Sequence, residues 1–125
     1  MAEVVAVNRY AVRDAAAFDA AVVALADRVQ RDGHPGVRSY DFYRSTPDEG
    51  RAIVTYDGPE AWVGHHDIIL SWPELASLRA AADLAAVDLH GPMTPAMQGW
   101  IDRMGLEARL RHLGEAVAGF RRPGP

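Results

Sequence analysis

The stretch "TYDGPEAWVGHH", residues 55–66, connects the end of a strand to the start of a helix through a turn. The preceding residues continue the strand pattern, so "RAIVTYD", residues 51–57, is predicted to be extended. Pro59 suits the first turn of a helix, and Gly58 is its expected cap. The helix then carries two adjacent histidines, His65 and His66, in surroundings that are otherwise apolar.

The elements before this stretch alternate between strand and helix. Residues 3–12, "EVVAVNRYAV", are rich in valine and predict a strand covered on both faces. Asp14 can cap the following helix, residues 15–31, whose apolar residues recur at helical spacing. Gly33 ends that helix, and residues 37–45, "VRSYDFYRS", predict a second strand that turns back through "TPDEG".

After the helix of residues 59–70, "SWPEL" begins another helical segment, and residues 85–93 resume strand character. The predicted order is therefore β-α-β-β-α-β, which is the pattern of a ferredoxin-like α+β domain over residues 1–93. A four-stranded sheet of this kind has helices on one face only. We therefore expect a homodimer in which two subunits pack their sheets together as a dimeric α/β barrel.

Residues 94–125 exceed what such a domain needs, and we expect them to form a C-terminal helical arm with a short frayed tail, "FRRPGP". Thr94 and Pro95 make a cap and a first-turn proline, and a stripe of Met97, Trp100, Ile101 and Met104 follows. After Gly105, a similar period continues through Leu106, Leu110, Leu113 and Val117. The arm either packs on its own subunit or its partner, or closes a ligand pocket with Met97, Trp100 and Met104.

Composition excludes several classes of protein. The chain of 125 residues suits one domain, and its net charge of −4 comes from interspersed acidic and basic residues, which argues against nucleic-acid binding. The sequence has no cysteine, hence no disulfide and no thiolate site. It has no signal-peptide pattern and no apolar run of about 20 residues that could span a bilayer. We expect a cytoplasmic protein with no membrane partner.

The element order, "GVRSYDFYRS" after the first helix, and "TYDGPEAWVGHH" together resemble the antibiotic biosynthesis monooxygenase-like family of dimeric α/β barrels, over residues 3 to about 93. His65 stands where that family commonly has a histidine. The superfamily includes cofactor-free monooxygenases that act on polycyclic phenols, quinol oxygenases, heme-degrading enzymes and polyketide cyclases, so the fold does not settle the function.

The two histidines flank the line from Trp62 to Ile69 when the helix is drawn at about 100° per residue, so both lie inside its apolar arc. They are either catalytic bases or core residues that bond to backbone or to a tyrosine. A shared metal is disfavoured, because adjacent helical residues diverge, unlike the i, i+4 spacing of zinc-binding pairs. We predict His65 to be the stronger catalytic candidate, with His66 nearer the helix-packing edge.

The resemblance also implies roles for residues on other elements. In several members of the family an asparagine on the first strand points into the substrate pocket, and Asn8 looks equivalent; its amide could stabilise an oxyanion. Alternatively, Asn8 bonds to neighbouring backbone at the sheet edge. Trp62, Tyr40 and Trp72 are candidate substrate-binding residues, although tryptophans of this kind are more often core.

The function that the resemblance implies is a cofactor-independent monooxygenase acting on an aromatic or polyketide-like phenol or quinol. A histidine base, His65 or His66, would remove a proton, and Asn8 would stabilise the developing charge. We expect no flavin, heme or metal, and "WPELASLRAAADL" lacks the histidine that heme-binding relatives place there. The alternatives are a polyketide cyclase of the same fold and a dimeric small-ligand-binding module without catalysis.

Overall fold

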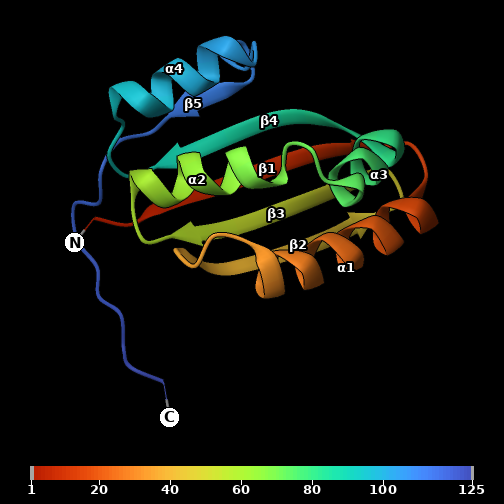
Figure 1. Cartoon of the computed structure of the whole chain (residues 1–125), viewed down its shortest axis with the longest axis horizontal. Helices are drawn as coiled ribbons and strands as arrows, with labels where there is room; N and C mark the ends of the chain where they lie inside the picture. The colour runs from red at the N-terminus through yellow and green to blue at the C-terminus, as the bar shows by residue number, and fades with distance from the viewer. Residues whose placement is uncertain (1, 125) are drawn as a thin grey trace.

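The computed structural model describes residues 2–124 and contains one five-stranded sheet with helices on one side (Figure 1). Chain order runs through β1 (Val4–Val12), α1 (Ala15–Asp32), β2 (Val37–Thr46), β3 (Glu49–Tyr56), α2 (Pro59–Ile69), α3 (Pro73–Ala81), β4 (Ala82–His90), α4 (Pro95–Arg103) and β5 (Leu110–His112). The predicted α+β, ferredoxin-like order is confirmed, with α3 as a second short helix between α2 and β4. Among the described residues, none of the helices has the length and apolar character needed to span a bilayer.

The sheet has the strand order β2-β3-β1-β4-β5, and β1 lies at its centre. Strand β1 pairs antiparallel with β3 and with β4, so Asn8 lies between Ala52 and Val87. The pairing with β4 shifts register between Arg9 and Tyr10. A bulge of this kind inserts one extra residue into one strand. The side chains beyond the bulge therefore point in a different direction from those of a regular strand.

The helices begin at the residues that capping rules predict. The Asp14 carboxylate accepts a hydrogen bond from the backbone N–H of Ala17 (3.0 Å) at the start of α1. The Thr94 hydroxyl accepts one from Met97 (3.2 Å) at the start of α4. Helix α2 begins at Pro59 directly after Gly58. These local contacts explain why the element order could be predicted.

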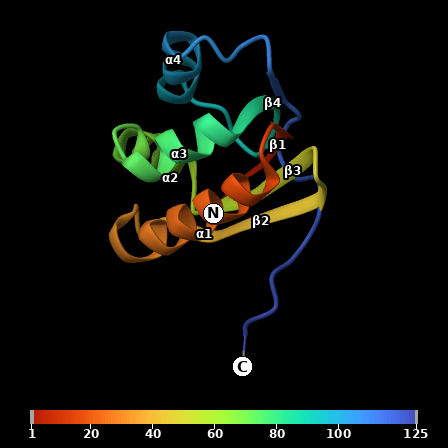
Figure 2. The ribbon, with the colours of Figure 1, turned by 90° about the vertical axis from the view of Figure 1, so that its right-hand side faces the viewer.

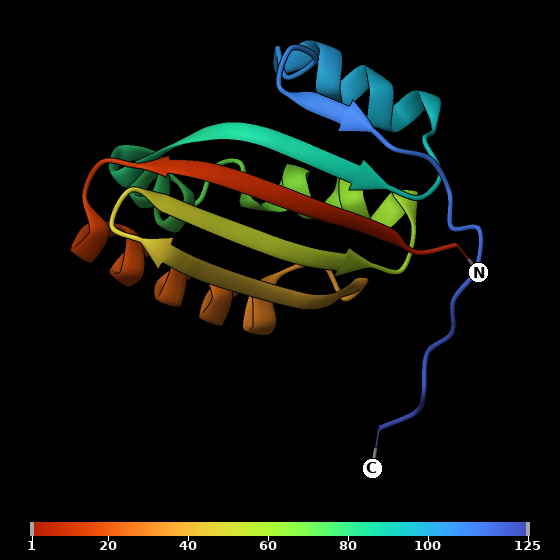
Figure 3. The same ribbon diagram turned by 180° about the vertical axis from the view of Figure 1, so that it is seen from behind.

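Helices α1, α2 and α3 all cover the same face of the sheet (Figure 2). Trp62 of α2 shares a buried cluster with Val54 and Leu89 of the sheet, whereas Phe18 and Leu25 of α1 belong to a second buried cluster. Within residues 2–124, the opposite face carries no helix (Figure 3). That face presents side chains such as Ile53, which is 38% exposed, beside half-buried Val5 and Val7.

The C-terminal extension is helical only in its first part. Helix α4 buries Met97, Trp100 and Ile101, as the predicted stripe requires. The expected continuation of helical structure through residues 106–117 is wrong. Gly105 adopts φ +66, a left-handed conformation that ends a helix, and β5 then adds in parallel to β4.

Strand pairing replaces that helix because β4 would otherwise leave an open edge of the sheet. The Val87 N–H donates to the Arg109 carbonyl (2.9 Å), and the Leu113 N–H donates to the Leu89 carbonyl (2.8 Å). Beyond β5, Val117 is fully exposed and residues 120–124 form no helix or strand, while Pro125 lies outside the described residues. The Arg121 guanidinium still contacts the Glu3 carboxylate (2.8 Å).

Candidate active site

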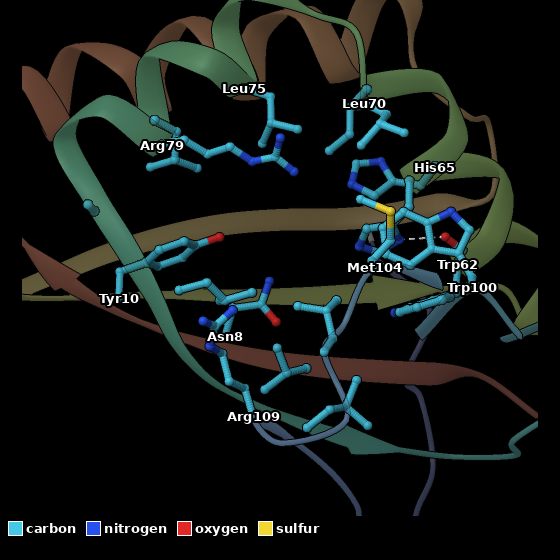
Figure 4. A pocket seen from close by; sticks show the side chains of 18 of the residues that line it. Asn8, Tyr10, Trp62, His65, Leu70, Leu75, Arg79, Trp100, Met104 and Arg109 are labelled. Atoms are coloured by element: carbon cyan, nitrogen blue, oxygen red, sulfur yellow. Dashed lines mark hydrogen bonds between the residues drawn. The ribbon is translucent and has the colours of Figure 1, made fainter. Parts of the chain in front are cut away.

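A cavity of about 480 Å³ lies between the sheet, helices α2 and α3, and the C-terminal extension (Figure 4). Strands β1 and β2 and helix α2 contribute most of the residues that the sequence nominated for a site. These are Asn8, Tyr40, Trp62, His65 and His66, all of which line the cavity. The sheet and helix that the sequence predicts therefore bring five separate candidates to one enclosed space.

The His66 side chain makes one hydrogen bond within the described residues, and that bond defines its tautomer. Its Nδ1 lies 2.7 Å from the carbonyl oxygen of Trp62, one turn earlier in α2. A carbonyl oxygen only accepts, so Nδ1 carries the hydrogen and Nε2 keeps an unprotonated lone pair. The ring packs between two aromatic side chains, with centroid distances of 4.3 Å to Trp62 and 5.0 Å to Trp100.

His65 is more deeply buried than His66. Its side chain is 1% exposed, and its ring lies 5.2 Å from that of Tyr40 and 5.6 Å from that of Tyr56. Within residues 2–124, its Nδ1 is buried and finds no hydrogen-bond partner. The two imidazoles meet edge to face with centroids 4.9 Å apart. His66, which is only half-buried, is thus the more accessible of the pair.

Burial holds both histidines in the neutral form. Desolvation, with smaller contributions from the neighbouring His66 and His34, lowers the pKa of His65 to about 3. Desolvation also lowers the pKa of His66 to about 4, although its bond to the Trp62 carbonyl and the nearby Asp67 carboxylate oppose the shift. At any pH above these values each imidazole is therefore neutral and keeps one ring nitrogen with a free lone pair.

The other end of the cavity is polar. Figure 4 shows Asn8, Tyr10, Arg79 and Arg109 there, away from the aromatic end formed by Trp62, Trp100 and His65. Burial raises the pKa of Tyr10 to about 12, while the Asn8 side chain and the Arg79 charge partly oppose that shift. The Tyr10 hydroxyl is therefore protonated at neutral pH and can donate a hydrogen bond.

Trp72 does not line the cavity, in contrast to the sequence-based prediction. It is buried in the cluster that contains Phe18, Leu25 and Leu78, and the Arg28 guanidinium lies 4.2 Å from its ring centroid. Trp72 precedes Pro73 at the start of α3, which turns it toward α1. Its role is to anchor α3 against α1.

Helix α4 supplies part of the wall, as the alternative reading of the arm proposed. The Trp100 indole N–H donates to the Asp67 carboxylate of α2 (3.0 Å), which fixes the two helices together. Trp100 and Met104 line the cavity, whereas Met97 is fully buried in the core. The extension therefore supplies part of the wall of a cavity whose other walls come from the elements β1 to β4.

Several lining residues were missed from the sequence, among them Tyr10, Arg79 and Arg109. Tyr10 lies two residues after Asn8 on β1, so strand alternation could have placed it on the same face. Arg79 sits in the last turn of α3 and Arg109 just before β5. Nothing in the local pattern distinguishes these two arginines from surface residues, because their position depends on how α3 and the extension fold back.

Comparison with known proteins finds relatives by structure alone. No protein-family model and no curated protein sequence matches this chain. MupZ from Pseudomonas fluorescens has a similar structure, with TM-score 0.73, 18% identity, and coverage of 97% of this chain and 95% of MupZ. SnoaB from Streptomyces nogalater, a cofactor-independent oxygenase, gives TM-score 0.59 and 22% identity over 75% of this chain and 96% of SnoaB.

A monooxygenase encoded by ActVA-Orf6 of Streptomyces coelicolor, solved with the ligand nanaomycin D, gives TM-score 0.52 and 20% identity over 73% of this chain and 88% of that one. The chain thus has the fold of the antibiotic biosynthesis monooxygenases, as the sequence resemblance predicted. The likeness to MupZ also spans the C-terminal extension, since it covers nearly the whole chain.

The lowered histidine pKa values predict a specific loss of stability in weak acid. An unfolded histidine, with a pKa near 6.5, binds a proton below that pH, whereas folded His66 stays neutral down to about 4. The unfolded state then binds more protons, so the free energy of unfolding falls as the pH drops from 6.5 to 5. His66→Gln should make this fall smaller by about 1.5 kcal/mol in urea unfolding.

His90→Gln is the matched control, because His90 is exposed on β4. The window stops at pH 5, above the range in which the paired carboxylates of Asp19, Glu74 and Asp88, whose pKa values are lowered, protonate. Equal pH dependence in the wild type and in His66→Gln would show that His66 is not held neutral.

Proposed function

We propose that the protein is a cofactor-independent monooxygenase that acts on an aromatic or polyketide-like phenol or quinol. The observation that carries this proposal is the orientation of His66, whose Nδ1 is bonded to the Trp62 carbonyl at 2.7 Å. This bond leaves Nε2 as a base in a cavity with aromatic walls. Catalytic bases in enzymes act when they are neutral, positioned and shielded from bulk water.

In this mechanism the ring system of the substrate packs against Trp62 and Trp100, and His66 Nε2 takes a phenolic proton. The resulting anion is electron-rich enough to reduce dioxygen directly. For a reacting carbon that carries two hydrogens, one oxygen atom enters the product as a carbonyl and the other leaves as water with those two hydrogens. The substrate supplies all the electrons, so the reaction needs no flavin, heme or metal.

Asn8 is proposed to stabilise negative charge as it develops, because a fixed amide N–H can donate to a phenolate or to a dioxygen-derived oxyanion. His65 was the first candidate for the base from the sequence. Its 1% exposure and its contacts with Tyr40 and His66 favour a different role. We assign His65 to positioning of the His66 ring and His66 to proton transfer.

The solved structures support the reaction class. SnoaB is an oxygenase that needs no cofactor, and the Streptomyces coelicolor monooxygenase was solved with nanaomycin D. We therefore propose that a small aromatic molecule of comparable kind is the partner of this cavity, with no role for nucleic acid or membrane and with a cytoplasmic location.

A ring-closing cyclase is the second candidate, and one observation favours it. SnoaB covers 75% of this chain, whereas MupZ covers 97%, including the extension that brings Trp100 and Met104 to the cavity. A cavity reshaped by that wall could hold a flexible polyketide instead of a flat polycycle. The same neutral base would then form an enolate for aldol closure, and no dioxygen would be consumed.

Oxygen uptake with a panel of polycyclic phenols and quinols tests the proposal. His66→Gln keeps most of the shape of the side chain but removes the base, so kcat should fall by roughly 10²- to 10⁴-fold. His90→Gln, on the opposite face of the sheet, should keep wild-type turnover. Turnover that continues without oxygen would favour the cyclase, and wild-type turnover in His66→Gln would reject the histidine mechanism.

We also propose that a second copy of the chain covers the sheet face that carries no helix. Ile53, Val5 and Val7 lie on that face, and exposed apolar area of this kind is stabilised by burial in an interface. Sedimentation equilibrium at micromolar concentration should give a dimer. Ile53→Arg should produce monomers, because it would bury an unpaired charge.

The matched control for this experiment is Val23→Arg, which places the same charge on an exposed position of α1. It should leave the dimer intact. A wild-type monomer would contradict the barrel arrangement, and a dimer that survives Ile53→Arg would place the interface elsewhere.

A further inference from the structure

Two arginines reach the polar end of the cavity from segments far apart in the sequence. Arg79 belongs to the last turn of α3, and Arg109 precedes β5 in the C-terminal extension. Both line the cavity, and Figure 4 shows their side chains at its polar end together with Asn8 and Tyr10. Within residues 2–124, neither guanidinium forms an ion pair with a carboxylate.

The acid that lines this part of the cavity is already neutralised. The Asp83 carboxylate pairs with the Arg13 guanidinium (2.5 Å). Arg13 also donates to the carbonyl oxygens of Arg79 (2.6 Å) and Ala80 (2.9 Å), which satisfies the C-terminal end of α3. Arg13 therefore fixes the backbone from which the Arg79 side chain extends, and no carboxylate of residues 2–124 forms an ion pair with Arg79.

The neighbouring polar groups also act as donors. The Tyr10 hydroxyl is protonated at neutral pH because burial raises its pKa to about 12. The positive charge of Arg79 lies close enough to Tyr10 to oppose part of this rise. The Asn8 amide supplies a further N–H beside it. Guanidinium groups and hydrogen-bond donors thus lie at one end of the cavity. Tryptophan rings and the unprotonated imidazole nitrogen of His66 lie at the other.

We propose that the substrate carries a carboxylate on its aromatic or polyketide-like body, and that Arg79 binds this carboxylate, with Arg109 as a second cation. The inference rests on the proposed function in taking the cavity as the substrate site. A guanidinium matches a carboxylate through two parallel N–H bonds, which fixes the orientation of the bound molecule as well as its affinity. The carboxylate would direct the opposite end of the substrate toward Trp62, Trp100 and His66.

Binding of a matched pair of probes tests the inference without any need for turnover. Anthraquinone-2-carboxylate and anthraquinone-2-carboxamide share a ring system and differ in charge. The wild type should bind the carboxylate roughly 10- to 100-fold more tightly than the amide by calorimetry, which is the usual strength of hydrogen bonds to a charged group. Arg79→Gln should remove most of this preference, and Arg109→Gln should reduce it.

Arg103→Gln is the control, because Arg103 is exposed on α4, does not line the cavity and changes the net charge equally. It should keep the wild-type preference. Equal affinity of the wild type for the two probes would overturn the inference, as would an equal loss in Arg103→Gln and Arg79→Gln, which would indicate general electrostatic attraction.

The same assay separates this inference from the proposed reaction. His66→Gln should keep the preference for the carboxylate while losing turnover. A protein that prefers the carboxylate but consumes no oxygen would overturn the monooxygenase and leave the anion site standing. A protein that oxidises phenols with no preference for the carboxylate would overturn the anion site alone.

Discussion

The hydrogen bond from His66 Nδ1 to the carbonyl oxygen of Trp62 determines which imidazole nitrogen is available in the cavity. It is a short contact of 2.7 Å within one turn of α2. Without it the ring could carry its proton on either nitrogen. With it, burial of a neutral ring between Trp62 and Trp100 yields an unprotonated Nε2 beside an apolar space.

Burial of this pair also constrains the surrounding fold. Neutral imidazoles avoid the cost of burying charge, so His65 and His66 can pack edge to face against each other, with Tyr40 and Tyr56 beside His65. The extension adds the outer wall, and the bond from the Trp100 indole to Asp67 holds that wall on α2. The sheet and the helices have the same fold as known oxygenases. The shape of this cavity depends also on residues 94–110.

Sequence reasoning succeeded where local contacts decide the structure. Asp14, Thr94 and Pro59 mark helix starts through hydrogen bonds or backbone geometry that act within one turn. It failed where a contact between distant segments decides the structure. The residues after Gly105 keep a helical period, but Leu110–His112 pair with the open edge of β4 instead of forming a helix.

The same distinction applies to the site. The helical arc predicts that both histidines face inward, and the resemblance to the family nominates Asn8. The location of Trp72 cannot be predicted from its residue type, because Trp72 packs against Arg28 of α1 and does not line the cavity. Arg79 and Arg109 could not be found at all, since only the folded chain brings the end of α3 and the extension to one end of the same space.

Nitrogen-15 NMR of the histidine rings, recorded from pH 7.5 to pH 4.5, tests the state of His66 most directly. Down to pH 5, His66 should have a protonated Nδ1 and an unprotonated Nε2, because its pKa is lowered to about 4. His66 should therefore show little titration above pH 5. A proton on Nε2, or a titration midpoint near 6.5, would contradict the assignment of His66 as a neutral base in the cavity.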